Sequence, residues 1–510
     1  MTQSSRTTNS IKNVIANILY QVFIIFMNFI TRWIFVKIFD PSYLGINGLF
    51  SNILSILSLA ELGISGAMLY SLYKPMYEGD KKQISALISY YKILYNRIAC
   101  IVAIIGLCFF PFLKYVINMD GNIPYLEIYY LLYLLGVVSS YLFVYKSSVI
   151  SAAQKDYKLK IYNMAFTIIK FILQILSLII FKSFMVYTII QIIVSIANNY
   201  FISYKAEQWY PYIKDKNYLD NASKKNVWNR IKSLFLYQIG GVALNNTDNI
   251  LISTLVGTVT LGIYSNYTMI ISNLSNALSL FFLGVHSSLG NLNASNNNEK
   301  KVFVFKLLNI IGFWLYGFSS ICLLILTQDF ITIFFGKVYM IDNFTLIVAV
   351  LNFYFSGSFY PLACYRTTIG LFNETKYIML FTAIINLVLS IVLGIYFGLV
   401  GILSATFIAR LLTTFWYEPR KLYKIFFKQS PLSYYLSHVL NFLYILIMTI
   451  VLKIVLDSID INNIYITFTI KLSVCMIFIN FMYFIIFKNT EEFKYLLKLL
   501  KEKIIQRNGE

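Results

Sequence analysis

Charged and amide side chains recur inside apolar stretches of this chain, where they are costly unless they meet water, a partner or a ligand. A charge at the centre of a membrane-crossing helix costs about 2.5 to 3.5 kcal/mol on insertion scales, so such residues usually face a bundle interior or an aqueous cavity. One apolar run carries a polar residue every three or four positions, which puts them on one helical face: Asn163, Thr167, Lys170, Gln174 and Ser177. We therefore expect Lys170 and Gln174 to line a hydrated internal space.

Further donors make this predicted space cationic. Arg32 and Lys37 lie near the end of the first apolar run, Arg366 and Arg410 lie near the ends of later ones, and Asn245 lies on a polar helical face. Guanidinium and ammonium groups bind phosphate and carboxylate oxygens well. Long basic side chains can also reach the membrane interface, so an anchoring role stays open for the Arg and Lys residues.

Two carboxylates, Glu61 and Asp248, also lie inside apolar runs. Their short side chains cannot reach the interface as Lys and Arg can. Each must be protonated, pair with a cation, or bind a transported cation. Both are candidates for coupling a process to H⁺ or Na⁺.

Enzymatic chemistry has few candidate residues. The chain lacks a GxxxxGK[ST] phosphate loop and the HExxH and GxSxG motifs, and its 2 His and 5 Cys form no metal-ligand pattern. A membrane-embedded polymerase or glycosyltransferase would need a sizeable catalytic loop, and the predicted outer loops are short. We expect no enzyme activity, no cofactor and no metal.

The apolar runs themselves predict an all-α polytopic membrane protein. A bilayer core about 30 Å thick needs roughly 20 helical residues per crossing, and about fourteen runs meet this length. They cover residues 14–36, 43–72, 93–113, 123–149, 157–181, 184–205, 231–255, 260–290, 302–328, 342–366, 374–397, 399–417, 432–456 and 463–487.

The net charge of +20 is explained by the distribution of basic residues about the predicted membrane and does not indicate nucleic-acid binding. About 34 of the 42 Lys and Arg residues lie on alternate loops or at the termini, all on one side of the predicted membrane. Since basic loops stay in the cytoplasm, both termini are predicted to be cytoplasmic.

The chain divides near its middle. A polar stretch at 206–230 predicts a cytoplasmic linker between a six-helix bundle at 1–205 and a second at 231–428. The motif that begins at Tyr43 recurs in a related form at Thr260, as internal repeats in transporters do. Two further helices at 429–487 and an amphipathic cytoplasmic tail at 488–510, rich in Lys and suited to anionic lipid, complete the prediction.

Short motifs follow one another along the chain at residues 40–50, 59–67, 71–75, 247–253, 256–257, 261–267, 288–291, 335–336 and 416–419. Taken in this order, they resemble the polysaccharide-transporter branch of the multidrug/oligosaccharidyl-lipid/polysaccharide (MOP) flippase superfamily, the bacterial carriers of capsule or O-antigen repeat units. The similarity extends over essentially the whole chain, although no single motif is chemically diagnostic.

This resemblance implies a V-shaped pair of six-helix bundles around a central cationic cavity, in the cytoplasmic membrane of a bacterium. It implies a flippase for undecaprenyl-diphosphate-linked oligosaccharide that works beside the polymerase and other enzymes of its pathway. Arg32, Lys37 and Lys170 would then bind the headgroup, and Glu61 or Asp248 would couple the cycle to an ion gradient. An exporter of another lipid-linked or small-molecule substrate and a membrane-embedded polymerase or glycosyltransferase remain the alternatives.

Overall fold

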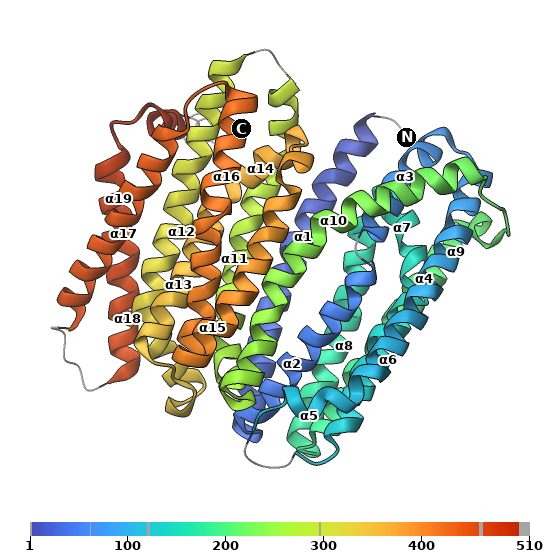
Figure 1. Cartoon of the computed structure of the whole chain (residues 1–510), viewed down its shortest axis with the longest axis horizontal. Coiled ribbons are helices and arrows are strands. Elements are labelled where there is room, and N and C mark those ends of the chain that lie inside the picture. Colours follow the sequence, from blue (N-terminus) through green and yellow to red (C-terminus); the bar gives the residue numbers. More distant parts are fainter. Residues whose placement is uncertain (1–2, 62, 120–122, 295–296, 458–462, 499–510) are drawn as a thin grey trace, which may run out of the picture. The chain divides into compact units, whose positions relative to one another are not determined.

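The chain is almost entirely helical. The computed structural model describes residues 3–61, 63–119, 123–294, 297–457 and 463–498, and these contain no strand (Figure 1). Within helices, the side chains of residues 3–15 and of several later residues, including Asn245, lie outside this description. The predicted all-α class is confirmed.

Contacts divide the chain into two compact units. The first comprises residues 1–265 and 379–398, and the second comprises residues 266–378 and 399–510. The first unit holds α1 (Gln3–Ile38), α2 (Pro41–Leu57), η1 (Ser58–Glu61), α3 (Ile64–Glu78), α4 (Lys81–Phe109), η2 (Phe110–Phe112), α5 (Leu113–Val116), α6 (Leu126–Tyr141), α7 (Val144–Ala152), α8 (Asp156–Ile180), α9 (Phe184–Trp209), η3 (Pro211–Lys214), α10 (Asn221–Leu251) and η4 (Ile252–Val256).

Two long helices contribute to both units, and the remaining elements belong to the second. The shared helices are α11 (Thr258–Ala294) and α15 (Phe372–Leu412). The second unit holds α12 (Asn298–Phe334), η5 (Lys337–Tyr339), α13 (Asn343–Ser358), α14 (Tyr360–Ile369), α16 (Thr414–Leu422), η6 (Tyr423–Phe427), α17 (Leu432–Asp457), α18 (Ile464–Val474), η7 (Cys475–Ile479) and α19 (Asn480–Phe487).

The apolar helices make this a multi-pass membrane protein. Within the described ranges, 10 helices are long and apolar enough to cross a bilayer, or 11 if the bent pair α6 and α7 is one span. The predicted count of about fourteen is not confirmed. The 43–72 prediction is interrupted by η1, the 231–255 prediction falls on the more polar α10, and the predictions at 374–397 and 399–417 fall within one helical stretch, Tyr377–Phe427.

That stretch is not straight, because Gly398 interrupts α15. Its φ of 58° and ψ of −134° are not helical, and only glycine adopts such a backbone at low cost. Residues 379–398 of α15 belong to the first unit, and the helix after Gly398 belongs to the second. A glycine therefore marks the point where the chain passes from one unit to the other.

The predicted linker, residues 206–230, overlaps two long helices. α9 ends at Trp209 and α10 begins at Asn221, so residues 206–209 and 221–230 are helical. The Asp220 carboxylate accepts a hydrogen bond from the Ser223 amide at 3.0 Å and caps the new helix. These bonds from Ser223 lower the pKa of Asp220. The predicted division into bundles and a C-terminal helix pair stays a prediction.

The predicted amphipathic tail is described only in part. Residues 491–498 are helical, and the tail beyond residue 498 lies outside the described residues.

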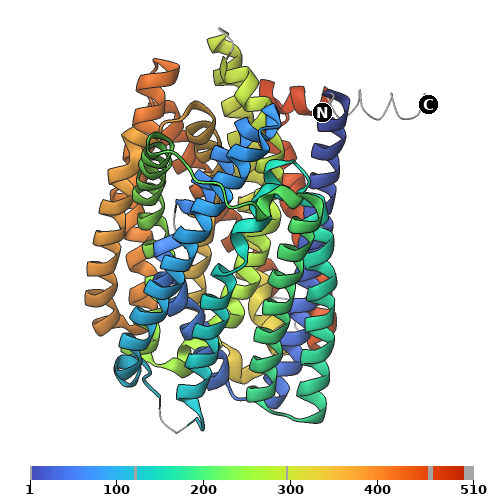
Figure 2. The same ribbon diagram turned by 90° about the vertical axis from the view of Figure 1, so that its right-hand side faces the viewer.

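In the first unit, α8 packs against both α1 and α9, and Figure 2 shows α8 and α9 running alongside each other. Phe35 of α1 is buried and its ring lies 5.9 Å from that of Phe184 and 5.3 Å from that of Tyr187, both on α9. This aromatic contact joins α1 to α9. The α8 helix packs against both of the helices that the contact joins.

Candidate functional site

The polar face of α8 is joined to α9 by amide pairs. Gln174 is 1% exposed, and its Nε2 donates to Gln191 Oε1 at 3.4 Å and to the Tyr187 carbonyl at 3.5 Å. About three turns earlier on α8, Asn163 Oδ1 accepts from Asn198 Nδ2 at 2.8 Å. Amides of this kind join helices in an apolar environment. The predicted polar stripe therefore fixes α8 on α9 at two points.

Lys170 lies on α8 between these two amide pairs. Its side chain is half-buried, and its Nζ is 4.7 Å from the centroid of the Phe171 ring. Of the carboxylates that the structure describes, none lies within 4.0 Å of this ammonium group. A cation inside an apolar helix without a nearby acid is a candidate for binding an anionic ligand.

Arg32 reaches the same part of the first unit from α1. Its Nη1 donates to Ser265 Oγ at 3.2 Å, and it interacts electrostatically with Tyr187. Gln174 bonds the backbone of Tyr187, so Arg32 and Gln174 approach one residue from two helices. The structure thus brings together helix faces that lie far apart in the sequence.

Lys37 lies apart from this group. It is exposed, and its Nζ is 3.8 Å from the centroid of the Trp33 ring on the same helix. A Trp and Lys pair on an exposed helical face is typical of the membrane interface. Of the two roles left open for Lys37, this contact favours the anchor.

Near Ser265, the two related motifs that begin at Tyr43 and Thr260 pack against each other at their glycines. A Cβ built on Gly45 would lie 1.9 Å from the Thr258 carbonyl oxygen, and one on Gly262 would lie 1.8 Å from the Pro41 carbonyl oxygen. Only glycine permits backbones to approach this closely. Gly45 and Gly262 occupy equivalent places in the related motifs. Close backbone packing therefore explains why both motifs have glycine at this place.

Hydrogen bonds extend this contact into a layer. The Thr258 amide donates to the Asn118 carbonyl at 2.7 Å, Asn118 Nδ2 donates to the Thr254 carbonyl at 3.2 Å, and Ser253 Oγ donates to the Val116 carbonyl at 3.0 Å. We call Pro41, Gly45, Asn118, Thr258 and Gly262 the glycine layer. It joins the start of α2 and the segment after α5 to the start of α11.

The two acidic candidates lie among tyrosines. Glu61 in η1 is half-buried, and its Oε1 accepts from the Tyr95 hydroxyl at 3.5 Å, with Tyr141 also in hydrogen-bond contact. Asp248 in α10 is half-buried and interacts electrostatically with Tyr264 of α11. Tyrosine donors can accompany a carboxylate through both of its protonation states.

In the second unit, Arg366 forms a tight ion pair. Its Nη1 lies 2.5 Å from Glu418 Oε1, and the two side chains are 14% and 8% exposed. The sequence predicts Arg366 as a site residue but does not indicate Glu418 as its partner. Arg410 is half-buried near the end of α15, where its carbonyl accepts from the Thr414 hydroxyl at 3.2 Å.

A second in-membrane ion pair was also missed. Lys471 Nζ on α18 lies 2.7 Å from Asp329 Oδ2 on α12, with both side chains about one-fifth exposed (19% and 23%). This pair, the bond from Trp314 Nε1 to Asn480 Oδ1 at 2.9 Å and the packing of Gly317 against Tyr483 hold the C-terminal helices on α12.

Some of the missed partners had a signal in the sequence. Gln191 and Asn198 are seven residues apart, and therefore two turns apart, inside an apolar run. Such a pair indicates a second polar stripe opposite α8. No group of three or more His, Cys, Asp or Glu side chains that could hold a metal is found in the part of the chain that the structure describes.

No family model and no curated protein matches this sequence. Solved structures do match in fold. The lipid II flippase MurJ in an inward closed conformation superimposes with a TM-score of 0.65 at 18% identity, over 94% of this chain and 99% of that one.

Two other transporters of the MOP superfamily are similar at lower scores. An inward-facing multidrug resistance transporter of the MATE family gives a TM-score of 0.58 at 14% identity, over 76% of this chain and 92% of that one. A transporter from Pyrococcus furiosus, described as having a binding pocket of reverse polarity, gives 0.52 at 13% identity, over 83% and 97%. The chain therefore has the fold of MOP-superfamily transporters.

Proposed function

We propose that this chain acts as a flippase, moving undecaprenyl-diphosphate-linked oligosaccharide repeat units from the inner to the outer leaflet of the bacterial cytoplasmic membrane. The product would feed capsule or another surface polysaccharide. The observation that carries this proposal is Lys170, a half-buried cation in an apolar helix with no described carboxylate within 4.0 Å. Such a cation is suited to an anionic headgroup.

The chemistry of the cargo fits these side chains. A diphosphate and a sugar headgroup need a hydrated, cationic route, whereas a polyprenyl tail can remain in the lipid beside the protein. Arg32 would bind phosphate oxygens with its guanidinium and Lys170 with its ammonium group. The fold similarity to a protein named as a lipid II flippase supports a lipid-linked cargo.

The transport cycle would open and close the glycine layer. The positive-inside rule places the segments of the glycine layer on the outer side of the membrane. These segments lie between the first and second, the third and fourth, and the seventh and eighth predicted spans. Release of the headgroup on that side would require the hydrogen bond from the Thr258 amide to the Asn118 carbonyl to break. Protonation or Na⁺ binding at Glu61 or Asp248 would supply the differential affinity that shifts this equilibrium.

The same charge rule sets the proposed orientation, with both termini in the cytoplasm. The cytoplasmic side is also where the cargo is made, and the polymerase of the pathway would receive it outside. This orientation is tested by replacing Lys82 or Lys114 with a single cysteine and labelling it with a membrane-impermeant maleimide. The cysteine at position 82 should react only after the membrane is permeabilised, and the cysteine at position 114 should react in intact cells.

The main experiment is complementation of a deletion strain in the native host. Lys170→Ala and Arg32→Ala should abolish surface polymer and cause lipid-linked oligosaccharide to accumulate, while the protein stays in the membrane. Lys170→Arg should restore part of the export. The control is Lys114→Ala, an exposed lysine whose removal should leave export unchanged. Wild-type polymer in both Ala variants would reject the site.

A second candidate is export of a small molecule, because a MATE-family transporter shares the fold. A cation exporter would be expected to present carboxylates along its route, and here Arg32 and Lys170 have the opposite sign. Drug susceptibility of the deletion strain separates the two functions. Increased susceptibility with normal surface polymer would favour the exporter.

A further inference from the structure

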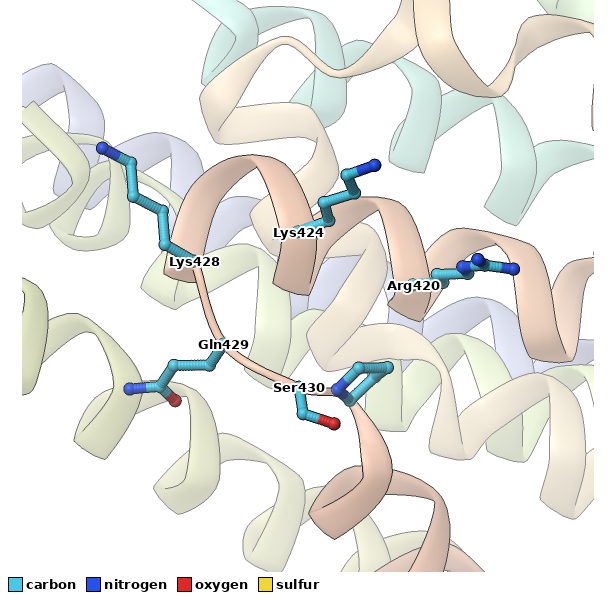
Figure 3. A pocket seen from close by; sticks show the side chains of 6 residues that line it. Arg420, Lys424, Lys428, Gln429 and Ser430 are labelled. Carbon is cyan, nitrogen blue, oxygen red and sulfur yellow. The ribbon is translucent and has the colours of Figure 1, made fainter.

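The second unit has an open basic pocket where α16 and η6 meet α17. Its volume is about 480 Å³. Figure 3 shows three basic side chains on successive turns of α16 and η6, with Gln429 and Ser430 on the loop that follows. The pocket is lined by Arg420, Lys424, Lys428, Gln429, Ser430 and Pro431.

The pocket concentrates positive charge. Arg420, Lys424 and Lys428 are spaced by four residues, all three are exposed, and none of the lining residues is acidic. The carboxylate nearest in sequence, Glu418, is buried and engaged by Arg366. Like charges at four-residue intervals share one side of a helix and repel one another, so an anion bound among them would lower their electrostatic energy.

The backbone around the pocket also favours an anion. Lys428 ends η6 with a φ of 55°, and the chain then turns into α17. The Leu432 amide donates to Ser430 Oγ at 3.3 Å, and the amides of Tyr434 and Tyr435 donate to the Pro431 carbonyl. Because α17 begins at Leu432, directly after the lining residues Ser430 and Pro431, the positive end of its dipole lies at the pocket.

An exposed apolar surface begins at the edge of the pocket. Leu432, Leu436 and Leu440 follow one another at four-residue intervals along α17 and are 71%, 58% and 57% exposed. Beside the pocket, the Trp416 ring lies 4.9 Å from the Tyr435 ring, and Trp416 is half exposed. Exposed Trp and Tyr are typical of the depth of the lipid headgroups, so the leucines below them lie at the depth of acyl chains.

We propose that this pocket binds the phosphate of an anionic phospholipid from the cytoplasmic leaflet, with its acyl chains along the leucines of α17. The basic side chains and the apolar surface match the two parts of such a lipid, whereas a free phosphate would use only the first part. The site lies within the second unit and does not depend on the cargo. It would tether this unit to anionic membrane.

The test uses the purified full-length protein in phosphatidylcholine nanodiscs that contain a small fraction of phosphatidylglycerol. Retained lipid is counted by native mass spectrometry. The variant Arg420→Gln/Lys424→Gln/Lys428→Gln should bind phosphatidylglycerol at least about tenfold more weakly than the unaltered protein. The matched control Lys82→Gln/Lys216→Gln/Lys225→Gln removes three exposed charges elsewhere and should retain the lipid.

Each contrary result is informative. Equal loss in both triple variants would overturn the site, since net charge alone would then explain binding. Displacement of the lipid by millimolar inorganic phosphate would overturn the lipid as its occupant and favour a free anion. Melting temperatures in pure phosphatidylcholine serve as a folding check, and Lys424→Gln alone replaces the triple variant if that variant is unstable. None of these measurements depends on export activity. The lipid-binding proposal is therefore tested independently of the proposed flippase function.

Discussion

Lys170 in the first unit and two basic residues in the second unit, all within apolar helices, have different surroundings. In the second unit, Arg366 and Lys471 lie 2.5 Å and 2.7 Å from carboxylate oxygens of Glu418 and Asp329. In the first unit, Lys170 has an aromatic ring beside it and no described carboxylate within 4.0 Å. A paired charge serves packing and is costly to disturb, whereas a cation without an acid nearby is available to a ligand.

The largest expected effect comes from breaking a pair. Glu418→Gln should destabilise the protein by about 3 to 5 kcal/mol, because it leaves the Arg366 charge buried without its carboxylate. Lys170→Met should leave stability unchanged or slightly raised. Thermal unfolding of both variants in the same detergent compares them directly. The double variant Arg366→Met/Glu418→Leu should recover most of the loss, and no recovery would mean that the two residues act independently.

The next effect separates packing from charge inside the first unit. Gly262→Ala should cost about 1 to 3 kcal/mol or more, since its Cβ would lie 1.8 Å from a backbone oxygen that cannot simply rotate away. Gly48→Ala is the matched control on α2, because nothing lies within 4 Å of a Cβ there. Membrane protein level and melting temperature are the measurements. Equal tolerance of both substitutions would remove the glycine layer as a close contact.

A third prediction concerns a carboxylate that bonds to neutral donors outside the spans. Burial disfavours ionisation of Asp342, but hydrogen bonds from the Thr345 hydroxyl and amide outweigh it and lower its pKa below 3.8. Asp342→Ala should cost about 1 kcal/mol at neutral pH through loss of the α13 cap.

The pH dependence of the Asp342 cap has a fixed sign. Because the folded pKa is lowered, the stabilisation is complete above the ordinary pKa and disappears as pH falls through the lower folded value. Asp342→Asn should keep the cap at pH 7 and remove this acid dependence. Unfolding curves between pH 3 and pH 7 measure it, and identical curves for the native protein and the Asn variant would contradict the prediction.

The smallest effect tests whether the α8 amides only position Lys170. Gln174→Leu should lose about 0.6 kcal/mol of stability, a typical value for a hydrogen bond between membrane helices. Export should fall only partly, because the lysine remains. A complete loss of export at normal protein level would instead give Gln174 a direct contact with cargo.

Much of the fold is readable in the sequence because the bilayer dictates it. Apolar runs of the required length and the polar face that includes Lys170 and Gln174 follow from local order alone. The predicted count of about fourteen spans is not confirmed, because η1 interrupts one predicted span and α10 is more polar than a typical crossing.

The sequence by itself therefore determined a helical, multi-pass membrane protein, a cationic polar face on one helix, and a repeated glycine motif. Only the tertiary structure decided which residues become partners. Glu418 pairs with Arg366, Gln191 and Asn198 form hydrogen bonds with the polar face of α8, and the backbones pack closely at the glycines of the two motifs. The reason is physical: hydrogen bonds and ion pairs depend on distances of a few ångströms between helices. Such distances join residues 52 positions apart in the case of Arg366 and Glu418, and no periodicity along the chain records them.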